Sequence, residues 1–338
     1  MRTRPIVLTA LAALALALAH PAAALVPAKA DVEAALAAAY AQYKSLTEGK
    51  NADYIPALAT VPSNLFGIAL VTVDGQVYTV GDVEQLFSIQ SISKVFTLAE
   101  VLKDIGAKPV EETIGVDATG QVFNSIVAVE QFKGQEMNSF VNPGAIATTA
   151  MVPGATTGQV WSKIIGIHSD FAGRPLEVNQ EVYKSESESN QRNQAIAMLM
   201  HAYGRIKGDP LEATDLYTRQ CSINVNAKDL AVMAATLANG GKNPVTKKEV
   251  VSPEVVEEVL AVMATAGLYD DSGKWLFHTG LPAKSGVGGG IIAVSPGKFG
   301  IAAFSPPLDA AGNSVRAQQA IRDVSGTLDG NPYEVTPR

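Results

Sequence analysis

The stretch FSIQSISKVF at residues 87–96 sets serines and one lysine among apolar residues. Within it, Ser91 and Lys94 form an S-x-x-K pair, and residues three apart lie on one face of a helix. A serine hydroxyl is a poor nucleophile until a base takes its proton. Lysine is such a base only when it is neutral, and burial favours the neutral form. The pair therefore predicts nucleophilic catalysis by Ser91 with Lys94 as its base.

A second element, formed by Lys284, Ser285 and Gly286, supports this interpretation. Active-site serine enzymes that react with penicillin carry S-x-x-K early in the chain and K-T-G or K-S-G on a late strand, and the order and separation fit here. We expect Lys284 to lie near Lys94, to lower the pKa of Lys94 and to attract an anionic substrate. Gly286 would let the backbone approach the substrate closely. The other S-x-x-K, at residues 295–298, contains Pro-Gly and is explained by a turn.

The histidines and the cysteine do not indicate another chemistry. His20, His168, His201 and His278 show no metal-ligand spacing, so no metal site is predicted. None of them stands in a context typical of a Ser-His-Asp triad, so a nucleophile here is expected to use another base. Cys221 is the single cysteine, which excludes an internal disulfide.

Hydrophobic spacing predicts the elements that would position these residues. Residues 66–82 indicate two strands joined at Asp74-Gly75, and residues 289–307 indicate a second hairpin that turns at Pro296-Gly297. Between the two hairpins, helical patterns alternate with Gly, Pro and Asn clusters. The predicted helices cover residues 31–46, 91–105, 190–204 and 227–241, with a last helix from Ser314.

Strands near both ends of the chain and helices between them predict an α+β fold. One antiparallel sheet would be built from the N- and C-terminal segments, with a helical subdomain inserted beside it. We expect the sheet part at about residues 31–90 and 280–338, and the helical part at about residues 91–279.

The composition suits a large folded domain and excludes some partners. The chain has 338 residues, of which 47% are hydrophobic and 17% charged, and this balance excludes a disordered chain. The net charge is −7 and Lys and Arg form no dense cluster, so nucleic acid is not an expected partner.

The first 30 residues are typical of a secretory signal peptide. Two arginines precede an apolar run at residues 6–19, and alanine-rich stretches follow. The run is too short for a comfortable membrane span. We predict that residues 1–30 are removed, that the mature chain starts near Leu25 or Asp31, and that it is periplasmic or secreted with no membrane association after cleavage.

Seven blocks of sequence, taken in order, resemble the serine-dependent glutaminase family. The resemblance runs from about Tyr54 to about Pro307 and implies a β-lactamase/transpeptidase-like fold. It also implies hydrolysis of L-glutamine to L-glutamate and ammonia, no cofactor, and a homo-oligomer, either a dimer or a tetramer. The blocks are FSIQSISKVF, FNS (123–125), NPGAI (142–146), SESESNQRNQAIA (185–197), YTRQCSI (217–223), MAATLANGG (233–241) and GLPAKSGVGGGI (280–291).

The resemblance implies a role for each matching residue. Ser91 would be the nucleophile and Lys94 its base, the backbone N–H groups of Ser91 and Val287 would hold the oxyanion, and Tyr217 or Tyr269 would protonate the departing ammonia. Lys284, Ser285 and Gly286 would support them. The expected substrate contacts are Tyr54, Ser91, Asn142, Glu186, Asn193, Tyr217, Tyr269 and Val287.

Two of these contacts also have an explanation in their spacing. Glu186 and Asn193 are seven residues apart, so they would share one face of a continuous helix and suit the ammonium and carboxylate of a free amino acid. Asn142 stands in a loop-like NPGA, where Pro143 would hold it in an extended conformation. Pro143 and Ser139 depart from the family pattern, which usually has Ala and Pro there.

Two other functions remain open from the residues alone. A β-lactamase or D,D-peptidase-type serine hydrolase would share Ser91, Lys94 and Lys284. A non-catalytic amino-acid-binding protein would share the polar residues that contact the substrate.

Overall fold

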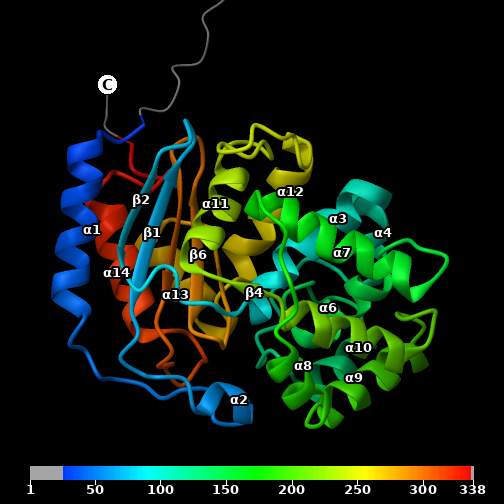
Figure 1. Cartoon of the computed structure of the whole chain (residues 1–338). Coiled ribbons are helices and arrows are strands. Elements are labelled where there is room, and N and C mark those ends of the chain that lie inside the picture. Colours follow the sequence, from blue (N-terminus) through cyan, green and yellow to red (C-terminus); the bar gives the residue numbers. More distant parts are fainter. Residues whose placement is uncertain (1–25, 336–338) are drawn as a thin grey trace, which may run out of the picture.

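A five-stranded antiparallel sheet with the strand order β2-β1-β7-β6-β5 forms one side of the molecule (Figure 1). The computed structural model describes residues 26–335, so the predicted signal sequence lies almost entirely outside the described residues. Because β1 pairs with β7, segments from both ends of the chain build one sheet, which confirms the predicted α+β class. The strands are β1 (Gly67–Thr72), β2 (Val77–Gly81), β5 (Ala283–Ser285), β6 (Gly290–Ser295) and β7 (Phe299–Phe304).

Both predicted hairpins are present in the sheet. Asp74-Gly75 joins β1 to β2, and Gly75 has a φ of +96°, which glycine adopts without strain. Pro296-Gly297 joins β6 to β7. Exposure alternates along β2 because it is an edge strand with one face towards solvent, whereas β1, β6 and β7 are buried throughout.

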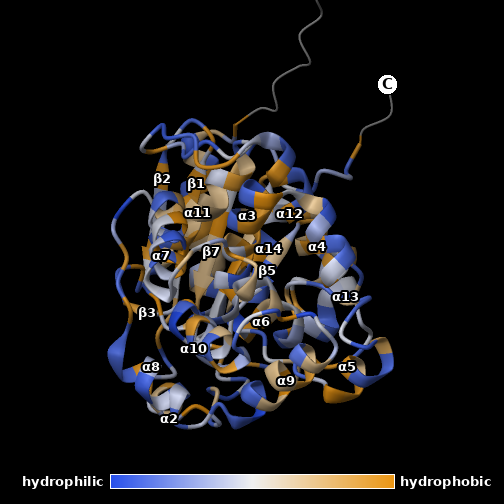
Figure 2. Ribbon diagram, turned by 90° about the vertical axis from the view of Figure 1, so that its right-hand side faces the viewer, coloured by the Kyte–Doolittle hydropathy of each residue, from blue (hydrophilic) through white to orange (hydrophobic). Residues whose placement is uncertain are grey.

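Helices cover both faces of the sheet. α1 (Lys29–Tyr43) and α14 (Val315–Thr327) pack side by side on one face, and α11 (Ala227–Ala238) packs against β1, β6 and β7 on the other (Figure 1). α11 therefore lies against the sheet, although it comes from the range that we assigned to the helical part. Figure 2 shows apolar residues concentrated on the sheet and on α11, where the largest core cluster lies.

The helical part stands beside the sheet, and its inner helices form their own apolar cluster (Figure 1). Its helices are α3 (Ser93–Ile105), α4 (Ala107–Thr113), α5 (Ile126–Phe132), α6 (Asn142–Ala150), α7 (Thr157–Ala172), α8 (Gln180–Ser187), α9 (Gln191–Ala202) and α10 (Pro210–Cys221). The remaining elements are α2 (Pro56–Ala59), α12 (Pro253–Ala266), α13 (Ser272–Thr279), the paired strands β3 (Phe87–Ser88) and β4 (Asn224–Val225), and 3₁₀ turns at Gln90–Ile92 and Tyr269–Asp271.

The helix predictions hold for long periodic segments. The predicted helix at 31–46 is α1, that at 190–204 is α9, and that at 227–241 is α11. The last predicted helix is α14, and the Ser314 hydroxyl caps it by accepting a hydrogen bond from Ala317 N. In the described part of the chain, no helix combines the length and apolar character that a membrane span requires.

The contact between α11 and β7 depends on a glycine. A Cβ built on Gly300 would lie 2.0 Å from the Ala235 backbone nitrogen, so any side chain there would push α11 off the sheet. We expect Gly300→Ala to lower the free energy of unfolding by at least about 2–3 kcal/mol, the upper range for overpacking. Urea titration followed by circular dichroism measures this change.

Gly166 provides the matched control for that substitution. It lies inside α7, and a Cβ on it would meet nothing within 4 Å. Because glycine weakens a helix interior, Gly166→Ala is expected to raise the free energy of unfolding by about 0.5–1 kcal/mol. Equal effects of the two substitutions would contradict this account of the sheet packing.

Candidate active site

Ser91 lies on a sharp turn where β3 meets α3. The turn is a 3₁₀ helix from Gln90 to Ile92 that leads directly into α3 at Ser93, so the predicted helix around Ser91–Ile105 is confirmed, with a 3₁₀ first turn. Gln90 has a φ of +51°, which is strained for a residue other than glycine and persists only where surrounding contacts hold it. The turn therefore places Ser91 one helical turn before Lys94, shortly after the buried strand β3.

The late glycine-rich segment packs directly on this turn. A Cβ on Gly286 would lie 2.8 Å from Ile89 O, and one on Gly288 would lie 2.6 Å from Ser88 O. Neither position can therefore carry a side chain without moving the backbone beside Ser91. This is why the segment after Lys284 needs glycines, in agreement with the predicted close backbone approach.

Lys94 is buried in the first turn of α3, with 1% of its surface exposed. Its Nζ donates hydrogen bonds to Phe140 O at 3.0 Å and to Asn142 Oδ1 at 2.8 Å. Burial lowers the pKa of Lys94 from 10.5 to about 8, while the nearby Cys221 and Glu186 oppose part of this change. A neutral amine is thus accessible near neutral pH, although no hydrogen bond to Ser91 occurs among the described residues.

Lys284 lies on β5 with no exposed surface, and its Nζ donates to Ser285 O at 2.7 Å. Burial, and then the charge of Lys94, hold the pKa of Lys284 well below its usual value. The repulsion shows that the two amines lie close together. It disfavours charge on the pair as a whole, so the predicted lowering of the pKa of Lys94 by Lys284 stays a prediction.

A cavity of about 320 Å³ opens beside Ser91. Seven of the eight residues predicted to contact substrate line it, and they come from seven different elements or loops of the chain. Tyr269 is the exception, since it packs with Val287 in a small apolar cluster next to the cavity. The predicted residues that line the cavity are Tyr54, Ser91, Asn142, Glu186, Asn193, Tyr217 and Val287.

Glu186 and Asn193 face the same cavity from two different helices. α8 ends at Ser187 and α9 begins at Gln191, so the two residues do not share a continuous helix, although both reach the cavity. Burial raises the pKa of Glu186 to about 7, while a hydrogen bond from Gln90 and the charge of Lys94 lower it. Asn193 Oδ1 accepts a hydrogen bond from Asn142 Nδ2 at 3.0 Å.

Asn142 connects Lys94 to the cavity. Its Oδ1 accepts hydrogen bonds from Lys94 Nζ and, at 3.1 Å, from the Tyr217 hydroxyl. The predicted loop is wrong here, because Asn142 is the first residue of α6 and the extended residue is Val141. Pro143 fits this position, since an N–H in the first helical turn has no intrahelical acceptor to lose.

The second departure from the family pattern also has a structural explanation. The hydroxyl of Ser139 accepts a hydrogen bond from Thr148 Oγ1 at 2.8 Å, which links the segment before α6 to the helix itself. Both departures therefore lie around α6, and both are compatible with the position of Asn142.

Two tyrosine hydroxyls are available as proton donors. Burial raises the pKa of Tyr217 well above its usual value. Burial also raises the pKa of Tyr269 to about 12, although hydrogen bonding with Ser91 and Ser285 opposes the change. Tyr269 has a φ of +54°, and Lys284 Nζ lies 4.3 Å from the centre of its ring. Both hydroxyls are protonated at neutral pH, and Tyr269 is the one that approaches Ser91.

The backbone near Ser91 offers two N–H groups. Within residues 26–335, the N–H of Ser91 and the N–H of Val287 donate to no protein acceptor. Both residues line the cavity. Two unpaired donors at one cavity can stabilise a negative oxygen.

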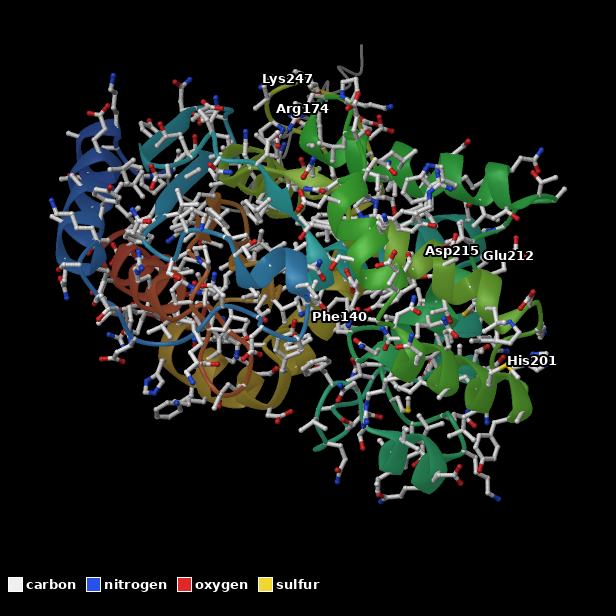
Figure 3. All side chains as sticks on the ribbon, turned by 60° about the horizontal axis from the view of Figure 1, so that its bottom comes forward. Phe140, Arg174, His201, Glu212, Asp215 and Lys247 are labelled. Carbon is white, nitrogen blue, oxygen red and sulfur yellow. The ribbon has the colours of Figure 1, made fainter. Side chains whose placement is uncertain are left out.

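None of the histidines in the described part of the chain lines the Ser91 cavity. His168 is buried, with Nδ1 at 2.7 Å from Ile164 O and Nε2 at 3.2 Å from Ser93 O, and burial lowers its pKa to about 4. Phe140, whose carbonyl oxygen accepts a hydrogen bond from Lys94, lies near the middle of the molecule in Figure 3, whereas His201 lies at the outer edge of the helical part. Across the described residues, no group of three His, Cys, Asp or Glu side chains could hold a metal ion.

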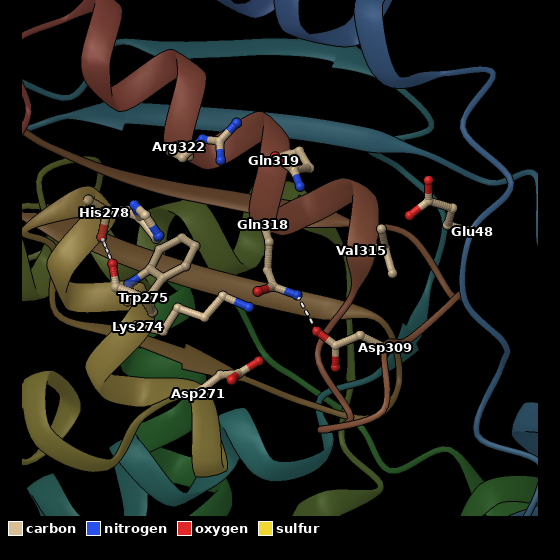
Figure 4. Close-up of a pocket in the computed structure, with 11 residues that line it drawn as sticks. Glu48, Asp271, Lys274, Trp275, His278, Asp309, Val315, Gln318, Gln319 and Arg322 are labelled. Atoms are coloured by element: carbon tan, nitrogen blue, oxygen red, sulfur yellow. Dashed lines mark hydrogen bonds between the residues drawn. The ribbon is translucent and has the colours of Figure 1, made fainter.

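A second cavity, of about 270 Å³, lies between α13 and α14 (Figure 4). None of the predicted site residues lines it. Its polar side chains include Lys274, Asp309, Gln318 and His278, and Gln318 Nε2 donates to Asp309 Oδ2 at 2.8 Å. It lacks a nucleophile with a buried base, so the Ser91 cavity is the candidate active site.

Sequence reasoning missed half of the cavity lining. All of the missed residues except Ile55 lie in the sequence blocks that carry the family resemblance, but no role was assigned to them there. They come from loops, turns and the starts of helices, where no periodicity marks a surface. The missed residues are Ile55, Gln90, Phe123, Asn124, Ser189, Asn190 and Arg192.

The chain is similar to known proteins along most of its length. The family described as Glutaminase matches residues 49–333. A protein named Glutaminase from Colwellia psychrerythraea is 53% identical over 302 residues, covering 89% of this chain and 97% of the relative. One from Mycobacterium ulcerans is 50% identical over 306 residues, covering 90% and 96%.

The chain is also similar to solved structures that are described as glutaminases. One described as probable glutaminase ybaS has a TM-score of 0.90 and 47% identity, covering 91% of this chain and 100% of its own. A probable glutaminase from Bacillus subtilis, complexed with 6-diazo-5-oxo-L-norleucine, has a TM-score of 0.80 and 26% identity, covering 92% and 99%.

The buried amine of Lys94 predicts a gain in stability when it is removed. The difference between a pKa of 10.5 and one of about 8 corresponds to about 3 kcal/mol of destabilisation, complete below pH 8 and lost as pH rises towards 10.5. Lys94→Met removes this cost, but Phe140 O and Asn142 Oδ1 then lose a hydrogen-bond donor, which offsets part of the gain. The substitution is therefore expected to raise the free energy of unfolding at pH 7 by about 2 kcal/mol. Urea titration at pH 7 and 9.5 measures the gain, which shrinks by more than half at pH 9.5.

An exposed lysine is the control for this substitution. Lys108 lies on α4 with 81% of its side chain exposed, so Lys108→Met is expected to change stability little and equally at both pH values. A loss of stability in Lys94→Met of the same size at both pH values would argue against a costly buried ammonium.

Proposed function

The chain belongs to the glutaminase family and hydrolyses glutamine, and we propose that this reaction proceeds through a covalent glutamyl ester on Ser91. One observation carries the proposal. A buried lysine with an accessible neutral form lies one turn after a serine at the cavity, and no histidine or metal cluster in the described residues offers another base. The residue types and their environment fit acyl transfer better than direct attack by water.

In the first step, neutral Lys94 takes the proton of Ser91, and Ser91 Oγ attacks the side-chain amide carbon of glutamine. The carbonyl oxygen gains a negative charge, which the N–H groups of Ser91 and Val287 hold. Both groups are free of protein acceptors in the described residues, which supports this role. An oxyanion donor typically contributes about 10²–10³ in rate.

In the second step, the C–N bond breaks and the departing amine receives a proton. Tyr269 is the preferred donor, because it interacts with the Ser91 hydroxyl and its pKa of about 12 keeps it protonated. Lys94 returns the proton that it took, directly or through Tyr269. Water then attacks the ester carbon, its proton passes to the same groups, and glutamate leaves with Ser91 restored.

The polar cavity wall matches the constant part of an amino acid. Glu186 supplies a carboxylate for the ammonium group, and the amides of Asn142 and Asn193 face the same space from α6 and α9. Tyr54, with 57% of its surface exposed, lies at the rim. The substrate is thereby oriented with its side-chain amide towards Ser91.

Two substitutions test the covalent mechanism. Ser91→Ala is expected to abolish ammonia release from glutamine while glutamine still binds, and Lys94→Ala is expected to lose at least the factor of about 10²–10⁴ typical of a general base. A coupled glutamate assay measures turnover, and calorimetry measures binding. Retention of more than a few per cent of the rate by Ser91→Ala would contradict the assignment.

The same preparation separates the alternatives. A β-lactamase-type enzyme would hydrolyse a chromogenic β-lactam in preference to glutamine, and a non-catalytic binding protein would release no ammonia. A diazoketone analogue of glutamine is expected to alkylate Ser91 Oγ with release of dinitrogen, so the wild type gains the mass of the analogue less that of N₂ and Ser91→Ala does not. The Bacillus subtilis relative in complex with such a compound motivates this choice of probe.

We further propose that the mature enzyme is exported and assembles as a dimer or tetramer. The basic, apolar and alanine-rich order of residues 1–30 supports export, and resemblance to the family supports self-association. N-terminal sequencing of protein recovered outside the cytoplasm is expected to begin near Leu25 or Asp31, and light scattering gives its mass. An intact Met1 in that fraction would contradict the proposed cleavage.

A further inference from the structure

Gln90 occupies an unusual position next to the nucleophile. It is buried, its backbone is in the left-handed region, and its side-chain amide reaches across to α8. Gln90 Nε2 donates hydrogen bonds to Ser88 Oγ at 3.1 Å and to Glu186 Oε2 at 3.2 Å. The proposed reaction at Ser91 does not use the amide of Gln90.

The side chain of Gln90 is fixed by the glycine-rich segment. A Cβ on Gly286 would lie 3.3 Å from Gln90 Cβ, and one on Gly288 would lie 3.4 Å from Gln90 Cγ. These glycines leave just enough room for the Gln90 side chain to pass between them and the turn. With both hydrogens of Nε2 directed to acceptors, the amide has one stable orientation.

We propose that Gln90 is a positioning residue, which occupies Glu186 Oε2 and leaves Oε1 as the acceptor for the ammonium group of the substrate. The inference rests on the proposed function, in which Glu186 receives that ammonium. Its direct consequence concerns substrate binding and not the chemical step at Ser91.

The groups that face Glu186 explain why this contact is needed. Tyr217 and Cys221 face it from α10, and Tyr54 faces it from the segment before α2; these three are neutral at physiological pH. Lys94 from α3 is the cation that favours the Glu186 carboxylate, and it is neutral when it acts as the base. Arg192 lines the cavity but directs its guanidinium to Asn124 O.

The hydrogen bond from Gln90 therefore favours the Glu186 carboxylate whether or not Lys94 is charged. Burial raises the pKa of Glu186 to about 7, and the hydrogen bond from Gln90 opposes this change more than the charge of Lys94 does. Loss of this donor would raise the pKa of Glu186 further, so a larger fraction of the enzyme would hold a neutral carboxyl group at pH 6–7. An ammonium ligand would bind that fraction weakly.

Binding of L-glutamine to Ser91→Ala tests the proposal without turnover or a catalytic proton transfer. In this background, the dissociation constant is measured by calorimetry from pH 5.5 to 8.5, with and without Gln90→Met, which keeps the length but has no donor. A hydrogen bond to a charged acceptor is worth about a tenfold change in an equilibrium constant. We expect about tenfold weaker binding at pH 6 and convergence within about twofold at pH 8.5.

Two further variants protect this experiment from a general folding defect. Gln90→Glu keeps the size and sets a second carboxyl group against Glu186, so it is expected to move the pH dependence further in the same direction. Ser88→Ala removes the other acceptor of the Gln90 amide, so it is expected to lower the melting temperature without moving the pH dependence of binding. A purely structural role would weaken binding equally at every pH.

The outcomes are distinguishable from those of the proposed function. If Ser91→Ala binds no glutamine at any pH, the assigned substrate site is wrong and the inference falls with it. If Ser91→Ala binds glutamine and neither Gln90 variant displaces the pH dependence, Glu186 does not depend on Gln90 and only the inference is overturned.

Discussion

The site depends on the burial of one amine. Lys94 is enclosed by the helical part, and its Nζ has carbonyl and amide oxygens as hydrogen-bond acceptors, with no carboxylate paired to it. Neutral acceptors stabilise an ammonium less than an ion pair would, so its pKa falls to a range where a base is useful. A carboxylate in the place of Asn142 would stabilise the charged form and remove the base.

The rest of the site follows from how two distant segments meet at the Ser91 turn. The early segment supplies the strained backbone at Gln90, and the late segment supplies glycines that pack against it. Each segment restricts the other, which keeps the N–H groups of Ser91 and Val287 at one cavity. The late K-S-G motif lies at the end of β5, where its glycine approaches the turn at backbone distance.

Sequence alone predicted the parts of the structure that have strong local signals. Alternating or helical hydrophobic patterns located both hairpins and α1, α9 and α11, and the motif resemblance located half of the residues that line the cavity. The seven-residue spacing of Glu186 and Asn193 could not predict how they face one cavity, because the two residues lie on different helices, α8 and α9. The pKa values of Lys284 and Lys94 depend on burial and on their mutual distance, and a single sequence contains neither quantity.

The pairing of β1 with β7 has a consequence for how the chain reaches its folded state. Gly67 pairs with Phe304, so β1 finds its neighbour β7, the central strand of the sheet, more than two hundred residues later in the chain. Contacts of such long range are slow to form because most of the loop-closure entropy must be lost first. A ribosome that has delivered only the first 250 residues holds an open β-hairpin with one unpaired edge and a helical segment whose inner face has no partner. The turn at Ser91 can therefore reach its final packing only late in synthesis. A chain that ends before β7 would expose aggregation-prone strand edges and would not form a smaller enzyme.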